Sequence, residues 1–311
     1  MKPVVLILGA SGMLGSMVVR FFSKQTNLSL RATVRDKNLL DKYRALFPRI
    51  DWRLFDACFP DGDLRSTVNG CAWIINAIGI TKPYVHDGNS DECRRAIEVN
   101  AVFPYRLGMA AIDSGSQVIQ IATDCVYSGE KGDYVEADRH HPLDVYGKTK
   151  SLGEYSLANT HHLRCSIIGP ELGKNTFLLE WFLRQPNKAT VNGFTNHRWN
   201  GITTLEFARI CHGVITTGLV LPGLQHVIPA DIVTKAELLN SFRCVYNRAD
   251  ITIDRVEAKE TIDRTLGTAD CALNNAIWRA AGYAQPPSIT SMMERLVADD
   301  YRTAPQTGTK T

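Results

Sequence analysis

The amino-acid sequence predicts an α/β fold in which a parallel β-sheet is covered by helices on both faces. Two observations support this prediction. Strand-like and helix-like stretches alternate through the first half of the 311-residue chain, and a glycine-rich turn follows the first strand. Parallel strands need helical crossovers, and these crossovers place helices on both faces of the sheet. After residue 170 the regular alternation ends, and we expect a smaller mixed α/β lobe there.

The composition is that of an ordinary globular protein, with 44% hydrophobic and 22% charged residues and a formal net charge of +3. Because this charge is small and no basic run carries interleaved aromatics, we expect no nucleic-acid partner. No apolar run approaches the roughly 18 residues of a membrane span, and the first residues do not form a signal peptide. We therefore expect a cytoplasmic protein without membrane association. The eight cysteines include no Cys-x-x-Cys pair, which indicates free thiols.

The elements of the first half follow from apolar periodicity. Strands are predicted at Val4–Leu8, Ser29–Arg35, Asp51–Asp56, Ala72–Ala77, Val118–Ala122 and Leu163–Ile168. Helices are predicted at Met13–Lys24 and Lys37–Phe47 and near 91–114 and 144–159. In the first of these helices, apolar side chains recur every three or four residues, which places them on one face that can pack on the sheet.

The turn after the first strand reads Gly9-Ala10-Ser11-Gly12-Met13-Leu14-Gly15. Glycines there permit a sharp turn and a close approach of the backbone to a pyrophosphate, which the N-terminus of the next helix can bind. Plain turns also use glycines, but the position directly after a hydrophobic strand favours a dinucleotide site in a Rossmann-like, doubly wound fold. The expected cofactor contacts in this turn are Gly9, Ser11, Gly12, Met13 and Leu14.

The end of the second strand bears on which dinucleotide is bound. Folds that use NAD often place an acid there to bind the ribose hydroxyls, whereas this strand ends in Thr33-Val34-Arg35-Asp36. Arg35 suits a 2′-phosphate, whereas Asp36 lies one residue beyond the position where NAD-dependent folds place the acid. We therefore favour NADPH over NADH. The alternative is that Arg35 is a solvated loop charge and that NADH is used.

The ends of the third and fourth strands offer further cofactor contacts. Asp56 is placed to accept a hydrogen bond from the adenine amino group, and Ala77, Ile78 and Gly79 are small or apolar residues beside which the cofactor can lie. Ligands of such folds bind at the carboxyl ends of the strands, which is where these residues are expected. Either stretch is also compatible with a simple strand-end turn.

Tyr146-Gly147-Lys148-Thr149-Lys150 places a tyrosine and a lysine one helical turn apart on one face. A phenol there can deliver a proton, and the ammonium beside it can lower the pKa of the phenol. Alone, the same spacing also fits a surface pair on an amphipathic helix.

Five motifs in this order resemble the extended short-chain dehydrogenase/reductase family. They are Gly9-x-x-Gly12-x-x-Gly15, Asn76-Ala77-Ile78-Gly79, Val99-Asn100-Ala101, Thr123-Asp124-Cys125-Val126-Tyr127 and Tyr146-x-x-x-Lys150. Within this family the chain is similar above all to dTDP-4-dehydrorhamnose reductases and related sugar-nucleotide reductases. The resemblance is strong over residues 1–170 and weaker afterwards, where Gly201-Ile202-Thr203-Thr204 still resembles the family.

The resemblance implies three catalytic residues. Tyr146 would donate a proton to a carbonyl oxygen as hydride arrives, Lys150 would hold the nicotinamide ribose, and Thr123 would orient the carbonyl. It also implies that Asn100 supports the cofactor site and that Ile168, before the cofactor-side turn, contacts the cofactor.

The sequence departs from the family at two positions beside Thr123. Cys125 stands where the family has an aromatic residue, and Ala122 stands where it often has serine. No histidine is placed by sequence to activate Cys125, so we expect a small buried residue and not a nucleophile.

The expected substrate contacts are Thr81, Thr123, Asp124, Tyr146, Asn175, Arg198 and Trp199. Arg198 could clamp a diphosphate and Trp199 could pack on a base or sugar. The alternative is that Asn192–Asn200 is a surface loop with Trp199 tucked into the core. No metal site is expected, because adjacent histidine pairs such as His140-His141 are poor chelators and no carboxylate cluster is evident.

We expect an NADP-binding Rossmann domain at 1–170 plus about 205–229, and a substrate-binding lobe at 171–204 and 230–302. Residues 303–311 are expected to be a disordered polar tail. The later elements expected are helices at Asn175–Arg184, Leu205–Thr216 and Lys235–Tyr246 and an edge strand at Leu224–Ile228.

The predicted function is therefore NADPH-dependent reduction of the keto group, at C4 by resemblance, of a dTDP-, UDP-, GDP- or CDP-linked deoxysugar in deoxysugar and polysaccharide biosynthesis. One alternative is an NAD(P)-dependent nucleotide-sugar epimerase. Another is a non-catalytic NADP-binding regulatory subunit, a type that includes the methionine adenosyltransferase beta subunit. Dehydration is disfavoured because the Asp-Glu pair of dehydratases is replaced by Asp124-Cys125. A homodimer is compatible with the sequence but not required by it.

Overall fold

The computed structural model describes residues 2–58, 61–172 and 176–299. At its centre lies a seven-stranded sheet with the order β11-β6-β5-β4-β1-β2-β3, in which all neighbouring strands are parallel. The strands are β1 (Val4–Leu8), β2 (Ser29–Val34), β3 (Asp51–Leu54), β4 (Trp73–Asn76), β5 (Gln117–Ala122), β6 (Thr160–Arg164) and β11 (Leu224–His226). The predicted Rossmann-like, doubly wound parallel sheet is confirmed.

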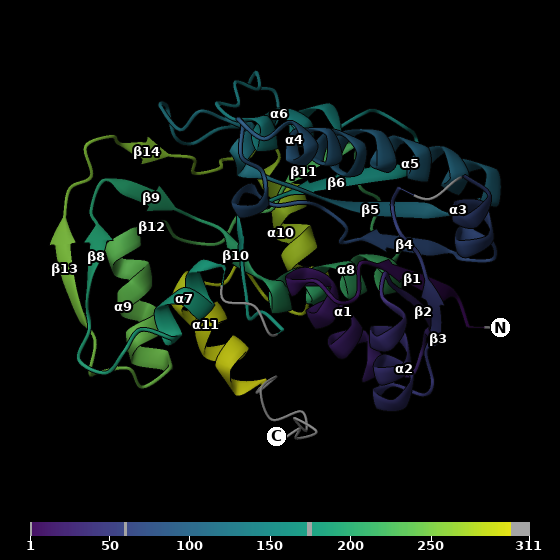
Figure 1. The fold of residues 1–311 in the computed structure, drawn as a ribbon, viewed down its shortest axis with the longest axis horizontal. Coiled ribbons are helices and arrows are strands. Elements are labelled where there is room, and N and C mark those ends of the chain that lie inside the picture. The colour runs from purple at the N-terminus through teal and green to yellow at the C-terminus, as the bar shows by residue number, and fades with distance from the viewer. Residues whose placement is uncertain (1, 59–60, 173–175, 300–311) are drawn as a thin grey trace.

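Helices cover both faces of this sheet (Figure 1). One face carries α1 (Met13–Ser23), α2 (Lys37–Leu46) and α8 (Thr204–Thr217). The other carries α3 (Asp61–Val68), α4 (Ser90–Ile97), α5 (Phe103–Ser114) and α6 (Val145–Leu152). Strand β1 explains the arrangement, because Val5 and Ile7 enter one apolar cluster while Leu6 and Leu8 enter another. Successive strand side chains point to opposite faces, so a continuous apolar strand is buried on both.

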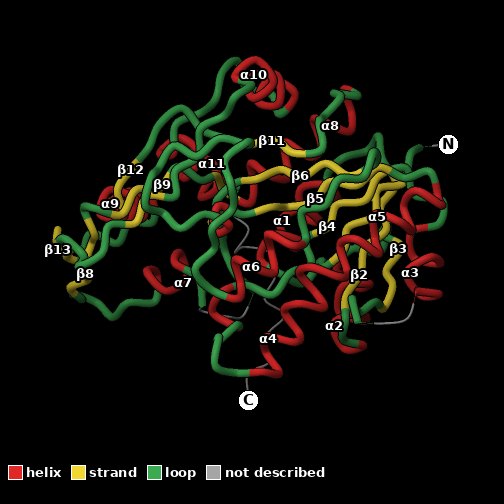
Figure 2. Tube along the Cα trace, turned by 90° about the horizontal axis from the view of Figure 1, so that it is seen from above, coloured by secondary structure: helices red, strands yellow, loops and turns green. Residues whose placement is uncertain are grey.

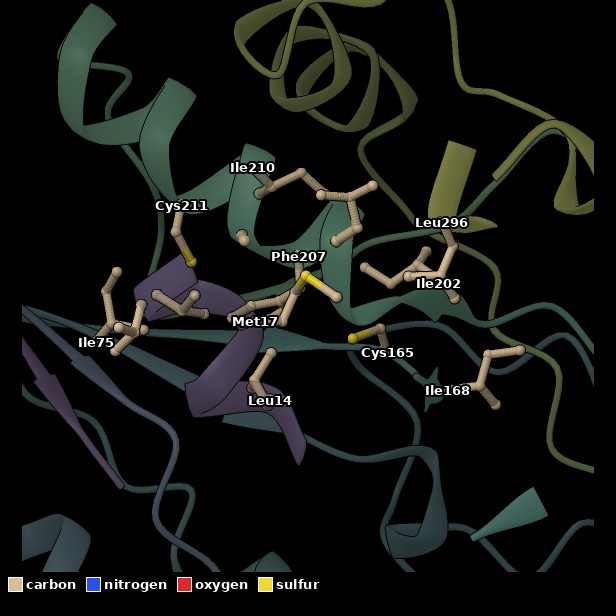
Figure 3. Packing of buried hydrophobic residues seen from close by; sticks show 14 of the residues in the cluster. Leu14, Met17, Ile75, Cys165, Ile168, Ile202, Phe207, Ile210, Cys211 and Leu296 are labelled. Carbon is tan, nitrogen blue, oxygen red and sulfur yellow. The ribbon is translucent and has the colours of Figure 1, made fainter. Parts of the chain in front are cut away.

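The larger apolar cluster joins the sheet to elements from the end of the chain. In Figure 3, Met17 of α1 and Phe207 of α8 lie between Ile75 of β4 and Leu296 of α11 (Ile289–Ala298), and all four belong to one apolar cluster. All four side chains are at most 3% exposed. The central sheet and the C-terminal helix therefore share one core.

The second half forms small sheets outside the central one. They are β7 (Ile167–Ile168) with β10 (Ile202–Thr203), β9 (His197–Trp199) between β12 (Val233–Thr234) and β14 (Ile262–Asp263), and β8 (Thr190–Phe194) with β13 (Thr252–Val256). The helices are α7 (Leu178–Leu183), α9 (Lys235–Val245), α10 (Cys271–Ala280) and α11. Figures 1 and 2 both place β8, β9, β12, β13 and α9 at the end of the molecule farthest from β3.

Two predicted elements are wrong in part, and one stretch without a predicted element contains strands. Leu163–Ile168 is not one strand, because β6 ends at Arg164 and Ile167–Ile168 pairs with β10 outside the main sheet. The helix predicted near 144–159 ends at Leu152, after which Gly153 lies against the Asn100 carbonyl. The stretch Asn192–Asn200 holds parts of β8 and β9, which are short and polar and so lack a clear apolar period.

Other elements depart less from the prediction or were missed. The helix predicted near 91–114 is α4 and α5 joined by a π-helical turn at Glu98–Val102. Helices α3, α10 and α11 were not predicted. Asn175 and the tail 303–311 lie outside the described residues.

Helices α8 and α10 lie so close together that only glycine fits at position 213. A Cβ atom there would lie 2.2 Å from the Ala280 carbonyl oxygen. We expect Gly213→Ala to lower the free energy of unfolding by about 1–3 kcal/mol, because the Ala280 backbone must move. Gly223→Ala, whose Cβ would meet nothing within 4 Å, should change it by less than about 0.5 kcal/mol. Urea unfolding measures both free energies. A free energy of unfolding of Gly213→Ala equal to that of wild type would contradict the prediction, because it would show that α8 and α10 can move apart without loss of stability.

Candidate active site

A cavity of about 1730 Å³ opens at the carboxyl ends of the central strands. Its walls include residues that follow β1, β2, β3, β4 and β5, together with side chains from α7, β9 and α9. Small-molecule pockets usually measure about 300–1,000 Å³, so this cavity has room for a dinucleotide and a second ligand. It lies where open α/β sheets bind ligands.

The glycine-rich turn forms one wall of the cavity. Gly9 has a φ of +78°, and a Cβ atom on Gly15 would lie 2.1 Å from the Gly9 carbonyl oxygen. Helix α1 therefore begins very close to β1, and its N-terminus has no side-chain cap. Exposed backbone N–H groups and the helix dipole favour an anion there. The predicted contacts Gly9, Ser11, Gly12, Met13 and Leu14 all border the cavity.

The residues after β2 and β3 also border the cavity as predicted. Arg35 is exposed and faces it, whereas Asp36 caps helix α2, its Oδ1 accepting from the Leu39 N–H at 2.9 Å. The carboxylate that directly follows Arg35 is thus engaged in capping, which leaves Arg35 to meet a ligand. Asp56 borders the cavity and accepts from the Cys58 N–H at 3.0 Å.

Two buried asparagines shape the turn after β4. Asn76 donates to Gln120 Oε1 at 2.7 Å and accepts from the Ile78 N–H at 3.0 Å. Asn100 accepts from the Ile80 N–H at 2.8 Å and donates to the Ile80 carbonyl at 2.9 Å. Ala77, Ile78 and Gly79 border the cavity as predicted.

Asn100 lies in the π-helical turn Glu98–Val102 and supports the site without lining the cavity. Its amide group is fully engaged by Ile80 and, at 3.2 Å, by Thr149 Oγ1 of α6. The side chain is 2% exposed and lies behind the cavity wall. Asn100 therefore positions the β4 turn against α6.

The three predicted catalytic side chains meet at one place in the cavity. Thr123 follows β5 and lies with Tyr146 in the wall of the cavity. Thr123 Oγ1 also lies 3.1 Å from Asp124 Oδ1, to which it donates. Lys150 follows Tyr146 by one turn of α6, and its Nζ donates to the Ile121 carbonyl at 3.0 Å. Ile168 of β7 borders the same region.

Burial governs the protonation of this group. It raises the pKa of Tyr146 well above its usual value, Cys125 and Asp124 add to the rise, and Thr123 opposes it. Burial also lowers the pKa of Lys150. The prediction that Lys150 lowers the pKa of Tyr146 is wrong, because desolvation of the phenolate outweighs neighbouring charges. Tyr146 is consequently held as a neutral phenol, the form that can donate a proton.

Burial, followed by the charge of Asp124, raises the pKa of Cys125 to about 12. A thiol with such a pKa has almost no thiolate at neutral pH and is a poor nucleophile. This agrees with the expectation that Cys125 does not act as a nucleophile. All eight cysteines are free, as predicted.

The predicted substrate contacts are only partly brought together. Thr81, Asp124 and Trp199 border the cavity, and Trp199 Nε1 donates to Ser166 Oγ at 2.8 Å. Arg198 instead lies away from the cavity, half exposed, with Nη1 3.0 Å from Asp263 Oδ2. Neighbouring residues of a strand face opposite sides, so the inward Trp199 on β9 turns Arg198 outward.

Among the cations of the cavity wall that sequence reasoning missed are Lys82 and Lys235. Lys82 lies 2.7 Å from Asp144 Oδ2, and Asp144 caps α6 by accepting from the Gly147 N–H at 2.8 Å. Lys235 begins α9. No local signal could have found Lys235, because it reaches the site only through the pairing of β12 with β9.

A buried polar network lies behind α6. Arg164 is fully buried and hydrogen-bonds Glu154 just after α6, and its Nη atoms lie 2.7 Å from His226 Nε2 and 2.8 Å from His140 Nε2. Guanidinium groups only donate, so both imidazole nitrogens must accept and both rings must be neutral. Burial, reinforced by the charge of Arg164, lowers the pKa of each histidine to about 4.

This network should make the fold sensitive to acid. Between pH 6.5 and 4 the unfolded chain protonates His140 and His226 while the folded chain does not, so stability falls as pH falls. The expected loss is about 1 kcal/mol per pH unit for each histidine. Urea unfolding at pH 7, 6 and 5 measures it. His226→Asn, or His140→Asn if that variant does not fold, should flatten the dependence, and the exposed His141→Asn should not. Equal slopes in all variants would contradict the network's role.

Two classes of site have no support within the described residues. No three His, Cys, Asp or Glu side chains in residues 2–58, 61–172 and 176–299 are grouped to hold a metal ion. In the same part of the chain, every helix is too short or too polar to cross a membrane.

A family model described as the RmlD substrate binding domain matches residues 1–298. Curated relatives include a dTDP-4-dehydrorhamnose reductase from Aggregatibacter actinomycetemcomitans, 42% identical over 82 residues (26% of this chain, 27% of the relative). Another from Salmonella typhimurium is 29% identical over 169 residues (52% of this chain, 55% of the relative). The chain thus spans about a quarter to about half of the length of these relatives.

Solved structures share the fold over nearly the whole chain. The dTDP-4-dehydrorhamnose reductase of Bacillus anthracis in complex with NADP has a TM-score of 0.72 and 20% identity, covering 96% of this chain and 100% of that one. A UDP-glucuronic acid 4-epimerase of Bacillus cereus in complex with NAD has a TM-score of 0.71 and 15% identity, covering 94% and 96%. At these identities the likeness concerns the fold.

Proposed function

We propose that this chain, which belongs to the RmlD substrate binding domain family, is an NADPH-dependent reductase of the keto group of a nucleotide-activated deoxysugar. The observation that carries the proposal is the meeting of Thr123, Tyr146 and Lys150 in a cavity that continues to the glycine-rich turn and Arg35. The names of the curated relatives support a dTDP-linked substrate with its keto group at C4.

The residues at the glycine-rich end of the cavity fit a dinucleotide phosphate. The uncapped N-terminus of α1 lies beside Gly9 and Gly12, and Arg35 is the charged group after β2 that faces the cavity. A guanidinium there suits a 2′-phosphate and supports NADPH over NADH. The NADP found in the Bacillus anthracis structure supports the same choice.

Each catalytic side chain has a defined task in this reaction. NADPH, when bound, would supply a hydride to the carbonyl carbon. Tyr146 gives its phenolic proton to the carbonyl oxygen, so that the ketone becomes a secondary alcohol. Thr123 turns its hydroxyl proton from Asp124 Oδ1 to the same oxygen and so orients the carbonyl. Lys150 would hold the nicotinamide ribose, and the phenolate left on Tyr146 regains a proton from solvent.

We assign the substrate to the part of the cavity walled by the second half of the chain. Leu179 of α7, Trp199 of β9 and Lys235 of α9 border the cavity there. This supports the division into a cofactor-binding part, 1–170 with about 205–229, and a substrate-binding part, 171–204 and 230–302.

The alternatives differ from the reductase in what they consume. An epimerase would interconvert two sugars without net use of NADPH. A regulatory subunit would bind NADPH, copurify with another enzyme and turn over no nucleotide sugar. The meeting of Thr123, Tyr146 and Lys150 in one cavity favours an enzyme over a binding subunit, because a binding subunit needs no proton donor.

Tyr146→Phe should remove turnover while leaving NADPH affinity within about twofold, because only the transferable proton is lost. NADPH oxidation is followed with dTDP-, UDP-, GDP- and CDP-linked 4-keto-deoxysugars. The surface variant Tyr105→Phe, at a residue 50% exposed, serves as the matched control and should keep full activity. Undiminished turnover in Tyr146→Phe would exclude Tyr146 as the donor. Folded wild-type protein that binds NADPH but reduces no substrate would overturn the proposed function.

Arg35→Ala should weaken NADPH binding about tenfold or more and leave NADH binding nearly unchanged, because only NADPH carries the 2′-phosphate. Fluorescence titration of both dinucleotides gives the two dissociation constants. Arg44→Ala, on the same helix-strand unit but outside the cavity wall, is the control. An equal loss for both dinucleotides would show that Arg35 does not read the 2′ position.

A further inference from the structure

Lys235 occupies a fixed position in the wall of the catalytic cavity. It is the first residue of α9 and borders the same cavity as Thr123 and Tyr146. The preceding strand β12 pairs with β9, so that Val233 lies opposite Trp199. A capping box holds the helix start, with Glu237 N–H donating to Thr234 Oγ1 at 3.2 Å and Thr234 N–H donating to Glu237 Oε2 at 2.8 Å.

The local surroundings of Lys235 are unfavourable for a cation. The N-terminus of a helix carries partial positive charge, which repels an ammonium. Burial lowers the pKa of Lys235, and the charge of Asp124 opposes that shift. Yet within the described residues no hydrogen bond or ion pair engages the Lys235 ammonium. A partly buried cation without a partner costs stability unless a ligand provides one.

Other cations near the catalytic residues are already engaged. Lys82 pairs with Asp144, Lys150 Nζ donates to the Ile121 carbonyl, and Arg264 Nε donates to the Tyr127 carbonyl at 2.9 Å. Arg198, which the sequence suggested as the anion clamp, pairs with Asp263 outside the cavity. Lys235 thus differs from its neighbours in having its charge open to a ligand.

We propose that Lys235 binds the diphosphate of the nucleotide-sugar substrate, an inference that rests on the proposed function. With the C4 carbonyl against Thr123 and Tyr146, the diphosphate on C1 lies across the sugar ring. Lys235 borders the same cavity as Asp124 but forms no ion pair with it, so its ammonium lies apart from the reacting end. A lysine ammonium is a compact point charge that suits phosphate oxygens.

The role of Lys235 is therefore substrate binding and not proton transfer. Trp199, fixed on the neighbouring strand, lies in the same wall and can pack on the sugar or base once the diphosphate is held. Arg198 lies opposite Thr234, the residue before Lys235, in the pairing of β9 with β12. Its side chain faces away from the cavity, where it pairs with Asp263. These two cations form a matched pair for a test.

The test measures binding of dTDP, UDP, GDP and CDP by isothermal titration calorimetry with NADPH present. For the nucleoside diphosphate that wild type binds best, Lys235→Ala should weaken binding about tenfold or more, because a charge-assisted contact is lost. Lys235→Arg should restore most of the affinity, and Arg198→Ala should bind as wild type. NADPH affinity should stay unchanged in all variants and also reports that they fold. If Lys235→Ala does not fold, Lys235→Gln replaces it.

The inference is overturned if Lys235→Ala binds the nucleoside diphosphate as tightly as wild type does. A loss in Arg198→Ala equal to that in Lys235→Ala would overturn it too, as would a wild type that binds none of the four. The proposed reduction fails by a different result, namely a wild type that binds NADPH and a nucleoside diphosphate but reduces no keto sugar.

Discussion

The close contact of helix α6 with the turn after β5 is the constraint on which the site depends. A Cβ atom on Gly147 would lie 2.4 Å from the Cys125 carbonyl oxygen, and one on Gly153 would lie 2.0 Å from the Asn100 carbonyl oxygen. Both ends of α6 therefore lie directly on neighbouring backbone. This approach brings Tyr146 to Thr123 and buries Lys150, and no larger side chain at either glycine would allow it.

Burial then determines the chemistry of the side chains that α6 presents. It holds Tyr146 as a phenol and removes Lys150 from water, where its ammonium is satisfied by the Ile121 carbonyl. Burial also keeps His140 and His226 neutral behind the helix, and they must be neutral to accept hydrogen bonds from the Arg164 guanidinium. The protonation states of Tyr146 and of the two histidines behind α6 are thus determined by desolvation more than by neighbouring opposite charges.

The cavity is assembled from both halves of the chain, which share a single apolar core. Leu296 of α11 packs in the same cluster as Met17 of α1 and Phe207 of α8 (Figure 3). The walls that carry Trp199 and Lys235 are consequently held at a defined distance from the sheet. Such preorganisation lets a substrate be positioned without first ordering the protein around it.

Features that depend on a few adjacent residues followed from the sequence alone. The alternation of strands and helices, the turn at Gly9–Gly15, Arg35 at the end of β2 and the Tyr146–Lys150 spacing are all set by local periodicity and short-range geometry. Tertiary structure decided the rest. It turned Arg198 outward and brought Lys235 inward through the pairing of β12 with β9, placed Asn100 behind the wall, and raised the pKa of Tyr146 where a lowering was expected. Strand pairing and burial arise from contacts between residues far apart in the chain, and no local pattern contains them.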